Sequence, residues 1–220
     1  MAGPFGDTFV EGTDSILELH TPTGPNAGTG WTVTNGQIAV RAATDLAEDT
    51  DPNASNQYVM NDDLGTDEMD VQADFTEVLN VGRRGVRARV STADAQGWEF
   101  SWDTGSGGRW LVSDGTASTT AADSWPGGAV TIKAEMRTGS GKLYANGVLK
   151  VTHSSNLLSG RTRAGITLLN FDLGGTAHQV DNFLATAASS STTASASETA
   201  STGLTESQAT MAKVKAVEGS

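Results

Sequence analysis

The sequence contains no cysteine. This absence excludes disulfide frameworks, cysteine-ligated zinc sites and thiol catalysis. Basic residues are also few, because 14 Lys and Arg stand against 26 Asp and Glu and the formal net charge is −12. A protein that binds nucleic acid needs basic side chains to displace counterions from phosphates, so nucleic acid is not an expected partner.

Long apolar segments are missing as well. No stretch of the chain reaches the ~20 apolar residues that a membrane-spanning helix requires, so a membrane is not an expected partner. The N-terminal residues MAGPFGDTFVEG carry neither the basic segment nor the apolar run of a secretory signal peptide. The sequence therefore predicts no export by such a signal.

Apolar and polar residues alternate in several short segments of the first 186 residues. In EMDVQADF every second residue is apolar, and GVRARV and VTIKAEMR repeat the pattern. This alternation is typical of antiparallel strands with one buried and one solvated face. The buried faces are predicted to hold Met69, Val71, Ala73, Phe75, Val86, Ala88, Val90, Val130, Ile132 and Ala134.

Turn signals separate these segments. Asn146-Gly147 lies between two strand-like runs and predicts a hairpin, because both positions favour positive φ angles. The string DTGSGG after Trp102 predicts a second turn. Many short strands with turns every ~10 residues favour an all-β sandwich.

The composition changes near residue 187. Residues 187–203 read AASSSTTASASETASTG and are predicted to form a low-complexity linker after a sandwich over 1–186. Residues 204–220 form a C-terminal tail with a weak helical pattern, in which Leu204, Met211 and Val214 fall on roughly one side. We expect this tail either to fray or to order against a partner through these three residues.

Several strings along the chain resemble a known superfamily. They are DTF at 7–9, HTP at 20–22, GWT at 30–32, GWEFSWDTGSGGRWLV at 97–112 and VDNF at 180–183. In this order they resemble the concanavalin A-like lectin/glucanase superfamily, specifically the laminin G-like modules of phage virion proteins and bacterial secreted proteins. The resemblance covers about residues 5–186 and implies a two-sheet antiparallel jelly-roll sandwich; the Ser/Thr/Ala-rich tail lies outside it. It implies no single function, because this fold hosts lectins, hydrolases and structural modules.

The strongest candidate for catalysis is the acidic strand that contains Glu68, Asp70 and Gln72. In β-glucanases of the resembled superfamily, alternating Glu, Asp and Glu on such a strand act as nucleophile, helper and acid/base. Here Gln72 takes the third position and cannot transfer a proton. Acids on a solvated strand also serve solubility, with Arg87 and Arg89 expected as cross-strand partners.

The histidines offer no alternative catalytic set. His20, His153 and His178 lack a nucleophile context such as G-x-S-x-G, and His20 is expected to anchor a loop. The sequence therefore predicts no catalytic residues and no enzyme.

A calcium site is a separate question. Asp49, Asp51 and Asn53 place oxygen-bearing side chains at alternate positions, and Ca²⁺ prefers oxygen ligands. An EF-hand would carry Gly and Glu where this loop has Ala54 and Met60. No cofactor is expected to be required, and these three residues are the candidate ligands if calcium binds.

Aromatic residues are the remaining candidates for binding. Trp98, Phe100 and Trp102 share one strand face, with Trp110 across the predicted turn. Trp98, Trp102 and Trp110 could form a platform that stacks on sugar rings. The alternative, which we favour, is that these rings fill the core between the sheets.

Together these features predict a non-enzymatic virion structural protein, such as a phage capsid decoration or a minor head or tail component. It would be assembled in the host cytoplasm and displayed on the particle surface, with other virion proteins and further copies of itself as partners and glycans as potential ligands. The alternative is a carbohydrate-binding module of a secreted bacterial protein.

Overall fold

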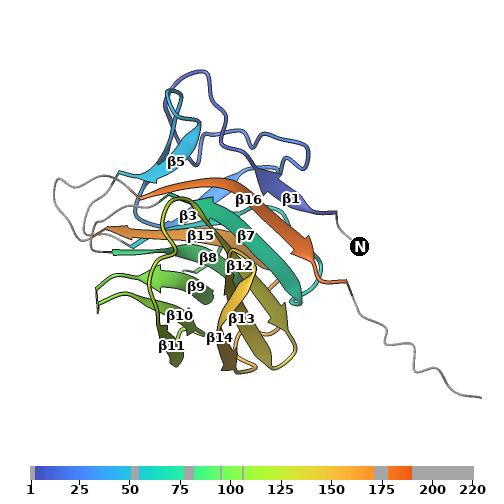
Figure 1. Ribbon diagram of the computed structural model, residues 1–220. Coiled ribbons are helices and arrows are strands. Elements are labelled where there is room, and N and C mark those ends of the chain that lie inside the picture. Colours follow the sequence, from blue (N-terminus) through green and yellow to red (C-terminus); the bar gives the residue numbers. More distant parts are fainter. Residues whose placement is uncertain are drawn as a thin grey trace, which may run out of the picture. The chain divides into compact units, whose positions relative to one another are not determined.

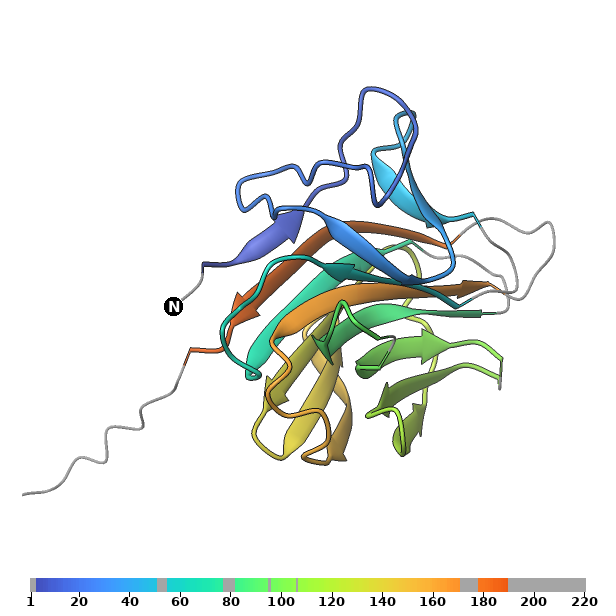
Figure 2. The ribbon, with the colours of Figure 1, turned by 180° about the vertical axis from the view of Figure 1, so that it is seen from behind.

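The computed structural model describes residues 3–50, 55–76, 82–94, 96–105, 107–170 and 178–189. Within these ranges all regular elements are β-strands, and there is no helix that could cross a membrane. Contacts divide the chain into one unit over Met1–Ala188 and a second over Ser189–Ser220. The first unit is built from two antiparallel sheets (Figures 1 and 2). The predicted all-β, two-sheet sandwich is therefore confirmed.

In the described part of the chain, sheet A has nine strands and sheet B seven, and the middle of sheet A consists of three long neighbours, β12, β7 and β16 (Figure 1). Strand β1 also pairs with β16, so the first and last strands of the sandwich are adjacent. In order across the sheet, with β1 beside β16, the strands are β14 (Val148–Ser154), β13 (Ser140–Ala145), β12 (Val130–Arg137), β7 (Met69–Phe75), β16 (Gln179–Ala187), β5 (Leu46–Asp49), β4 (Ile38–Arg41) and β2 (Ser15–Ile16), and β1 is Phe5–Asp7.

Sheet B has seven strands and faces the viewer in Figure 2. Its edges are β11 on one side and β3 on the other. In order the strands are β11 (Ser118–Ala122), β10 (Arg109–Ser113), β9 (Trp98–Asp103), β8 (Gly82–Val90), β15 (Arg163–Asn170), β6 (Ser55–Met60) and β3 (Trp31–Asn35).

The inward faces of the two sheets form one hydrophobic core. All ten residues predicted for the buried faces are at most 1% exposed, and nine of them belong to the core cluster. Val90 is buried outside this cluster. It follows Arg89, whose φ is +50°, at a point where the pairing between β8 and β15 shifts register. The Asn146-Gly147 hairpin is also confirmed, with φ angles of 48° and 78° between β13 and β14.

The expected cross-strand partners of the acidic strand are wrong. Strand β7 pairs with β12 and β16, whereas Arg87 and Arg89 lie on β8 in sheet B and are almost fully buried. The Asp70 carboxylate instead pairs with Arg137 at 2.7 Å and with Lys133 at 3.3 Å, both from β12. Alternation identified the solvated face of β7 but not the neighbouring strand.

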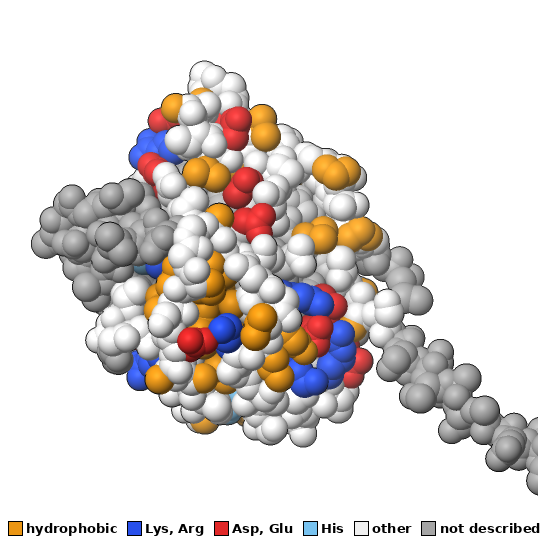
Figure 3. Space-filling view, viewed as in Figure 1, with side chains coloured by type: hydrophobic (Ala, Val, Ile, Leu, Met, Phe, Trp, Pro, Cys, Tyr) orange, Lys and Arg blue, Asp and Glu red, His pale blue; other side chains and the backbone are white. Residues whose placement is uncertain are grey.

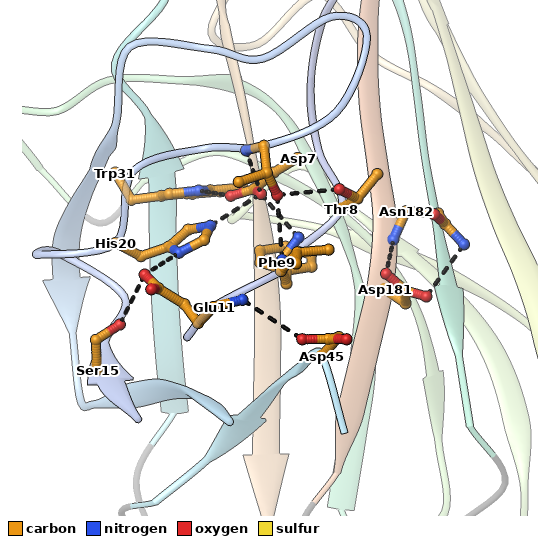
Figure 4. A network of polar contacts seen from close by, with 12 residues as sticks. Asp7, Thr8, Phe9, Glu11, Ser15, His20, Trp31, Asp45, Asp181 and Asn182 are labelled. Carbon is orange, nitrogen blue, oxygen red and sulfur yellow. Dashed lines mark hydrogen bonds and ion pairs between the residues drawn. The ribbon is translucent and has the colours of Figure 1, made fainter. Parts of the chain in front are cut away.

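A buried carboxylate fixes the N-terminal segment to the sandwich (Figure 4). Oδ1 of Asp7 accepts hydrogen bonds from the backbone N–H groups of Phe9 at 2.8 Å and Thr23 at 3.1 Å. Oδ2 accepts from the indole N–H of Trp31 at 2.7 Å. His20 Nε2 lies 2.9 Å from the same Oδ1. Asp7 thus connects β1 with four points of the following chain.

His20 lies between two carboxylates, because its Nδ1 is 2.6 Å from Oε1 of Glu11 (Figure 4). Both ring nitrogens therefore face acceptors, an arrangement that fits an imidazolium. Burial alone would lower the pKa of His20, but the hydrogen bonds and charges of Asp7 and Glu11 outweigh it and the pKa is raised above 6.5. His20 anchors this segment, as expected from the sequence.

Replacing Asp7 with asparagine should destabilise the sandwich. D7N removes the charge beside His20 and places an amide among four donors, and loss of one partner from a buried pair destabilises by about 3–5 kcal/mol. We expect a decrease of that size in the free energy of unfolding, measured by urea denaturation. The control is E18Q: Glu18 is an exposed acid of the same segment and is not among the partners of Asp7, so the change should stay under about 0.5 kcal/mol. Equal losses in the two variants would contradict the anchoring role.

His20 should also make stability depend on pH. Its folded-state pKa is raised, so its contribution is fully present below pH ~6.5 and is lost as the pH rises through the folded-state value. Urea unfolding of the wild type should therefore give a lower free energy of unfolding at pH 9 than at pH 6, and H20Q should reduce this difference. Parallel pH profiles for the two proteins would show that His20 is not the titrating group.

Candidate functional site

The outward face of sheet A carries a band of polar side chains. Strand β7 contributes Asp70, Gln72 and Asp74, which alternate with its buried core residues. Strand β12 adds Thr131 directly opposite Asp74 and Lys133 opposite Gln72. The band therefore runs along the middle of the sheet on the solvated side.

Two hollows lie along this band. The smaller, about 190 Å³, lies between β1 and the β7–β16 pair and is lined by Thr8, Gln72 and Leu184, among others. The larger, about 340 Å³, is lined by polar groups that include Asp74 and Thr131. Asn182 lines both hollows, so they adjoin at this residue.

A bulge in β16 places Asn182 between the hollows. The pairing of β16 with β7 shifts between Asp181 and Leu184, and Asn182 has a φ of 49°, which Asn tolerates better than most residues. Its amide nitrogen donates to Oδ2 of Asp74 at 3.0 Å and to Oδ2 of Asp181 at 3.2 Å. One amide therefore holds two carboxylates on the same side of the sheet.

The larger hollow is acidic. Asp70 forms ion pairs with Lys133 and Arg137, whereas in the described part of the chain neither Asp74 nor Asp181 pairs with a basic side chain. Burial, followed by the charges of Asp74, Asp45 and Asp7, raises the pKa of Asp181 above its usual range. On the face shown in Figure 3, acidic side chains without basic neighbours lie above a mixed cluster of acidic and basic ones.

The three candidate positions of the acidic strand, Glu68, Asp70 and Gln72, do not open together onto one hollow. Oε1 of Glu68 accepts hydrogen bonds from the backbone N–H and the hydroxyl of Thr138, which lower the pKa of Glu68. Asp70 is held by Arg137. Glu68 and Asp70 thus support the turn after β12, and of the three candidate positions only Gln72 lines a hollow.

The tryptophans occupy the core and not the surface. Trp98, Trp102 and Trp110 are 0%, 4% and 0% exposed, so their ring faces are not available to a sugar in this conformation. Trp102 packs against Trp110, and half-buried Trp125 stacks on Trp110 at 5.8 Å. The Arg84 guanidinium lies 4.2 Å from the centre of a Trp125 ring. The structure therefore places these rings in the core between the sheets, which is the alternative favoured from the sequence.

The calcium loop is only partly described. Asp49 is 6% exposed, its Oδ1 accepts the backbone N–H of His178, and burial raises its pKa to about 6. Calcium takes six to eight oxygen ligands, and this single buried carboxylate does not supply such a set. Asp51 and Asn53 lie outside the described residues, so calcium binding stays a prediction. The tail residues Leu204, Met211 and Val214 also lie outside them.

The residues that join the hollows are not among the site residues predicted from the sequence. Asp181 and Asn182 are part of the VDNF string that carried the resemblance, but their distance along the chain from Asp74 hid the contact. The local signal in the sequence was the polar pair Asp181-Asn182 between the apolar residues Val180 and Phe183. Only the pairing of β16 with β7 shows what these residues face.

Comparisons with solved structures identify the fold. No family model and no curated protein sequence matches the chain. The carbohydrate-binding module CBM66 from Bacillus subtilis is 13% identical at a TM-score of 0.51, covering 69% of this chain and 91% of that one. A β-glucanase from Bacillus licheniformis is 12% identical at 0.54, covering 84% and 98%. A Bacillus subtilis protein of unknown function with a galectin-like fold is 11% identical at 0.55, covering 80% and 97%.

These similarities correct one expectation and weaken another. The prediction that the chain is not an enzyme is overturned, because structures of this fold include a β-glucanase over 84% of the chain. The virion interpretation receives no support from them, whereas the alternative of a carbohydrate-binding module agrees with the match to CBM66. At these identities the similarity establishes the fold alone, a two-sheet antiparallel jelly-roll sandwich.

Proposed function

We propose that the protein binds carbohydrate on the outward face of sheet A, with the two adjoining hollows as neighbouring sugar sites. The observation that carries the proposal is the junction at Asn182, which lines both hollows and whose amide binds two carboxylates of the larger one, Asp74 and Asp181. With this function we also propose an extracellular location, which was the alternative considered from the sequence.

The chemistry of the lining suits a sugar. Hydroxyl groups of a sugar both donate and accept hydrogen bonds, carboxylates accept them, and the Gln72 amide can do both. The amide oxygen of Asn182 can accept, because its two N–H groups already bind Asp74 and Asp181. Leu46 and Leu184 add apolar contacts to one hollow each, next to which the C–H face of a ring can lie. The match to a module named for carbohydrate binding supports the same function.

Glycoside hydrolysis is a second candidate, favoured by Asp74 and Asp181. Both carboxylates bind the same amide nitrogen at 3.0 and 3.2 Å, so their bonded oxygens are at most about 6 Å apart, which fits the ~5–5.5 Å carboxyl pair of a retaining glycosidase. The raised pKa of Asp181 suits a general acid, and Asp74 would then serve as nucleophile. The match to a β-glucanase supports considering this activity.

Binding should depend on the amides that line the hollows. Because each amide makes one or two hydrogen bonds to a bound sugar, N182A and Q72A should weaken glycan affinity by about tenfold or more. The measurement is a glycan array with the full chain, followed by calorimetry of the best ligand for each variant. The matched control is Q96A, because Gln96 is an exposed amide residue in the loop before β9. Unchanged affinity in N182A and Q72A, or no glycan bound at all, would reject the proposed site.

Hydrolysis should depend on the two carboxylates. If Asp181 is the acid, D181N and D74N should each reduce the release of reducing ends by about 100-fold or more. Activity of the wild type should fall as the pH rises through the raised pKa of Asp181, because a general acid must be protonated. E68Q is the control, since Glu68 binds Thr138 outside both hollows. Binding without release in any protein would reject the hydrolytic candidate and leave the binding function intact.

A further inference from the structure

Strand β11 is an unprotected edge. It forms the outer edge of sheet B and hydrogen-bonds to β10 on one side only (Figures 1 and 2). Its sequence, STTAA, contains no charge and no proline, and all its residues except half-buried Ala121 are exposed. The pairing with β10 continues through all five residues without a bulge. Edge strands usually carry a charge, a proline or a bulge that prevents pairing with another chain.

The other terminal strands of the two sheet orders have such protection. Strand β14 carries Lys150, and its pairing with β13 shifts at Leu143. Strand β3 shifts register against β6 after Val33, and β2 has only two residues. Within the part of the chain that the structure describes, β11 is therefore the terminal strand best suited to accept a partner.

We propose that β11 pairs antiparallel with β11 of a second copy of the protein. A register centred on Thr120 uses all five residues, because Ser118 then faces Ala122 and Thr119 faces Ala121 of the other copy. Side chains of one pair lie on the same face of the sheet, and each pair joins only small Ser, Thr and Ala side chains. Within its own copy the Thr119 hydroxyl lies 2.9 Å from Nδ1 of His153 on β14, a side-chain contact that leaves the backbone edge of β11 open. The seven strands of sheet B would continue across the two-fold axis into the second copy.

The charges near the strand fit self-pairing. A net charge of −12 opposes association, so contact between copies requires a locally uncharged surface. Asp123 follows β11 and is neutralised by Lys150, 2.5 Å away. In the proposed register Asp123 lies opposite Ala117 of the second copy, and the two Asp123 residues are at opposite ends of the strand pair. Like charges therefore do not face each other.

The size of the contact indicates a weak dimer. Five residue pairs between two strands bury less surface than the ~1,000 Å² expected of a stable interface. Val148 and Leu149, next to Lys150 at the Asp123 end, are 58% and 49% exposed and add apolar surface there. We therefore expect dissociation in the micromolar range or weaker, which resists detection at low concentration.

Sedimentation of the full chain from about 10 µM to about 1 mM should show a monomer–dimer equilibrium. T120K places two lysines opposite each other on the two-fold axis and should weaken association by about tenfold or more. The control is T152K, the same change at an exposed position of β14, which should associate as the wild type does. A wild type that remains monomeric throughout, or equal weakening in both variants, would overturn the proposal.

Cysteine variants test the register of the β11 pairing and the identity of the segment that pairs with β11. They are suitable because the chain has no cysteine of its own. Residues directly opposite each other on antiparallel strands have Cα atoms about 4.5–5.5 Å apart, within disulfide range. Mild oxidation should therefore link T120C to its own counterpart much faster than S118C, which faces Ala122. Equal rates would show that a dimer uses another surface or that another segment occupies β11, and either result would overturn the proposal.

Discussion

The buried carboxylate of Asp7 is the constraint on which the N-terminal third of the sandwich depends. Its four hydrogen-bond partners come from positions 9 to 31, a stretch with little regular structure of its own. Without a charged acceptor, the buried N–H groups of that stretch would lack partners at a cost of about 1–3 kcal/mol each. Asp7 and Thr23 also line the smaller hollow, so the anchor and the candidate site share a wall.

Strand β16 connects this anchor to the rest of the site. Asp7 pairs with Phe183 on one side of β16, and on the other side the bulge turns Asn182 toward Asp74 on β7. A regular strand would keep strict alternation and could not present consecutive residues, Asp181 and Asn182, to the same outer surface. The irregularity of one strand thus creates the junction between the two hollows.

Much of the fold was predictable from the sequence, because alternation reports which residues share a strand face. It placed Met69 to Phe75 and Val130 to Ala134 correctly, and Asn146-Gly147 gave the hairpin. Alternation does not report which strands are neighbours, so Arg87 and Arg89 were assigned to the wrong acids. It also does not report which face of a strand is inside, so the position of the tryptophans remained open. The Asp74–Asn182 contact spans 108 residues and leaves no local pattern.

The distribution of charge over sheet A separates structural acids from those of the site. Glu68 and Asp70 are each satisfied by partners from β12 or the turn that follows it, and such pairs need no ligand to explain them. Asp74 also accepts a hydrogen bond from the Thr131 hydroxyl of β12, but within the described residues neither Asp74 nor Asp181 has a basic partner. The two carboxylates share one amide, and burial makes the ionised form of Asp181 less favourable. A solvated strand could avoid that penalty with Ser or Thr at either position. Hydroxyl or cationic groups of a ligand in the larger hollow would compensate these acids, and this is the physical reason to place the function there and not on the buried tryptophans.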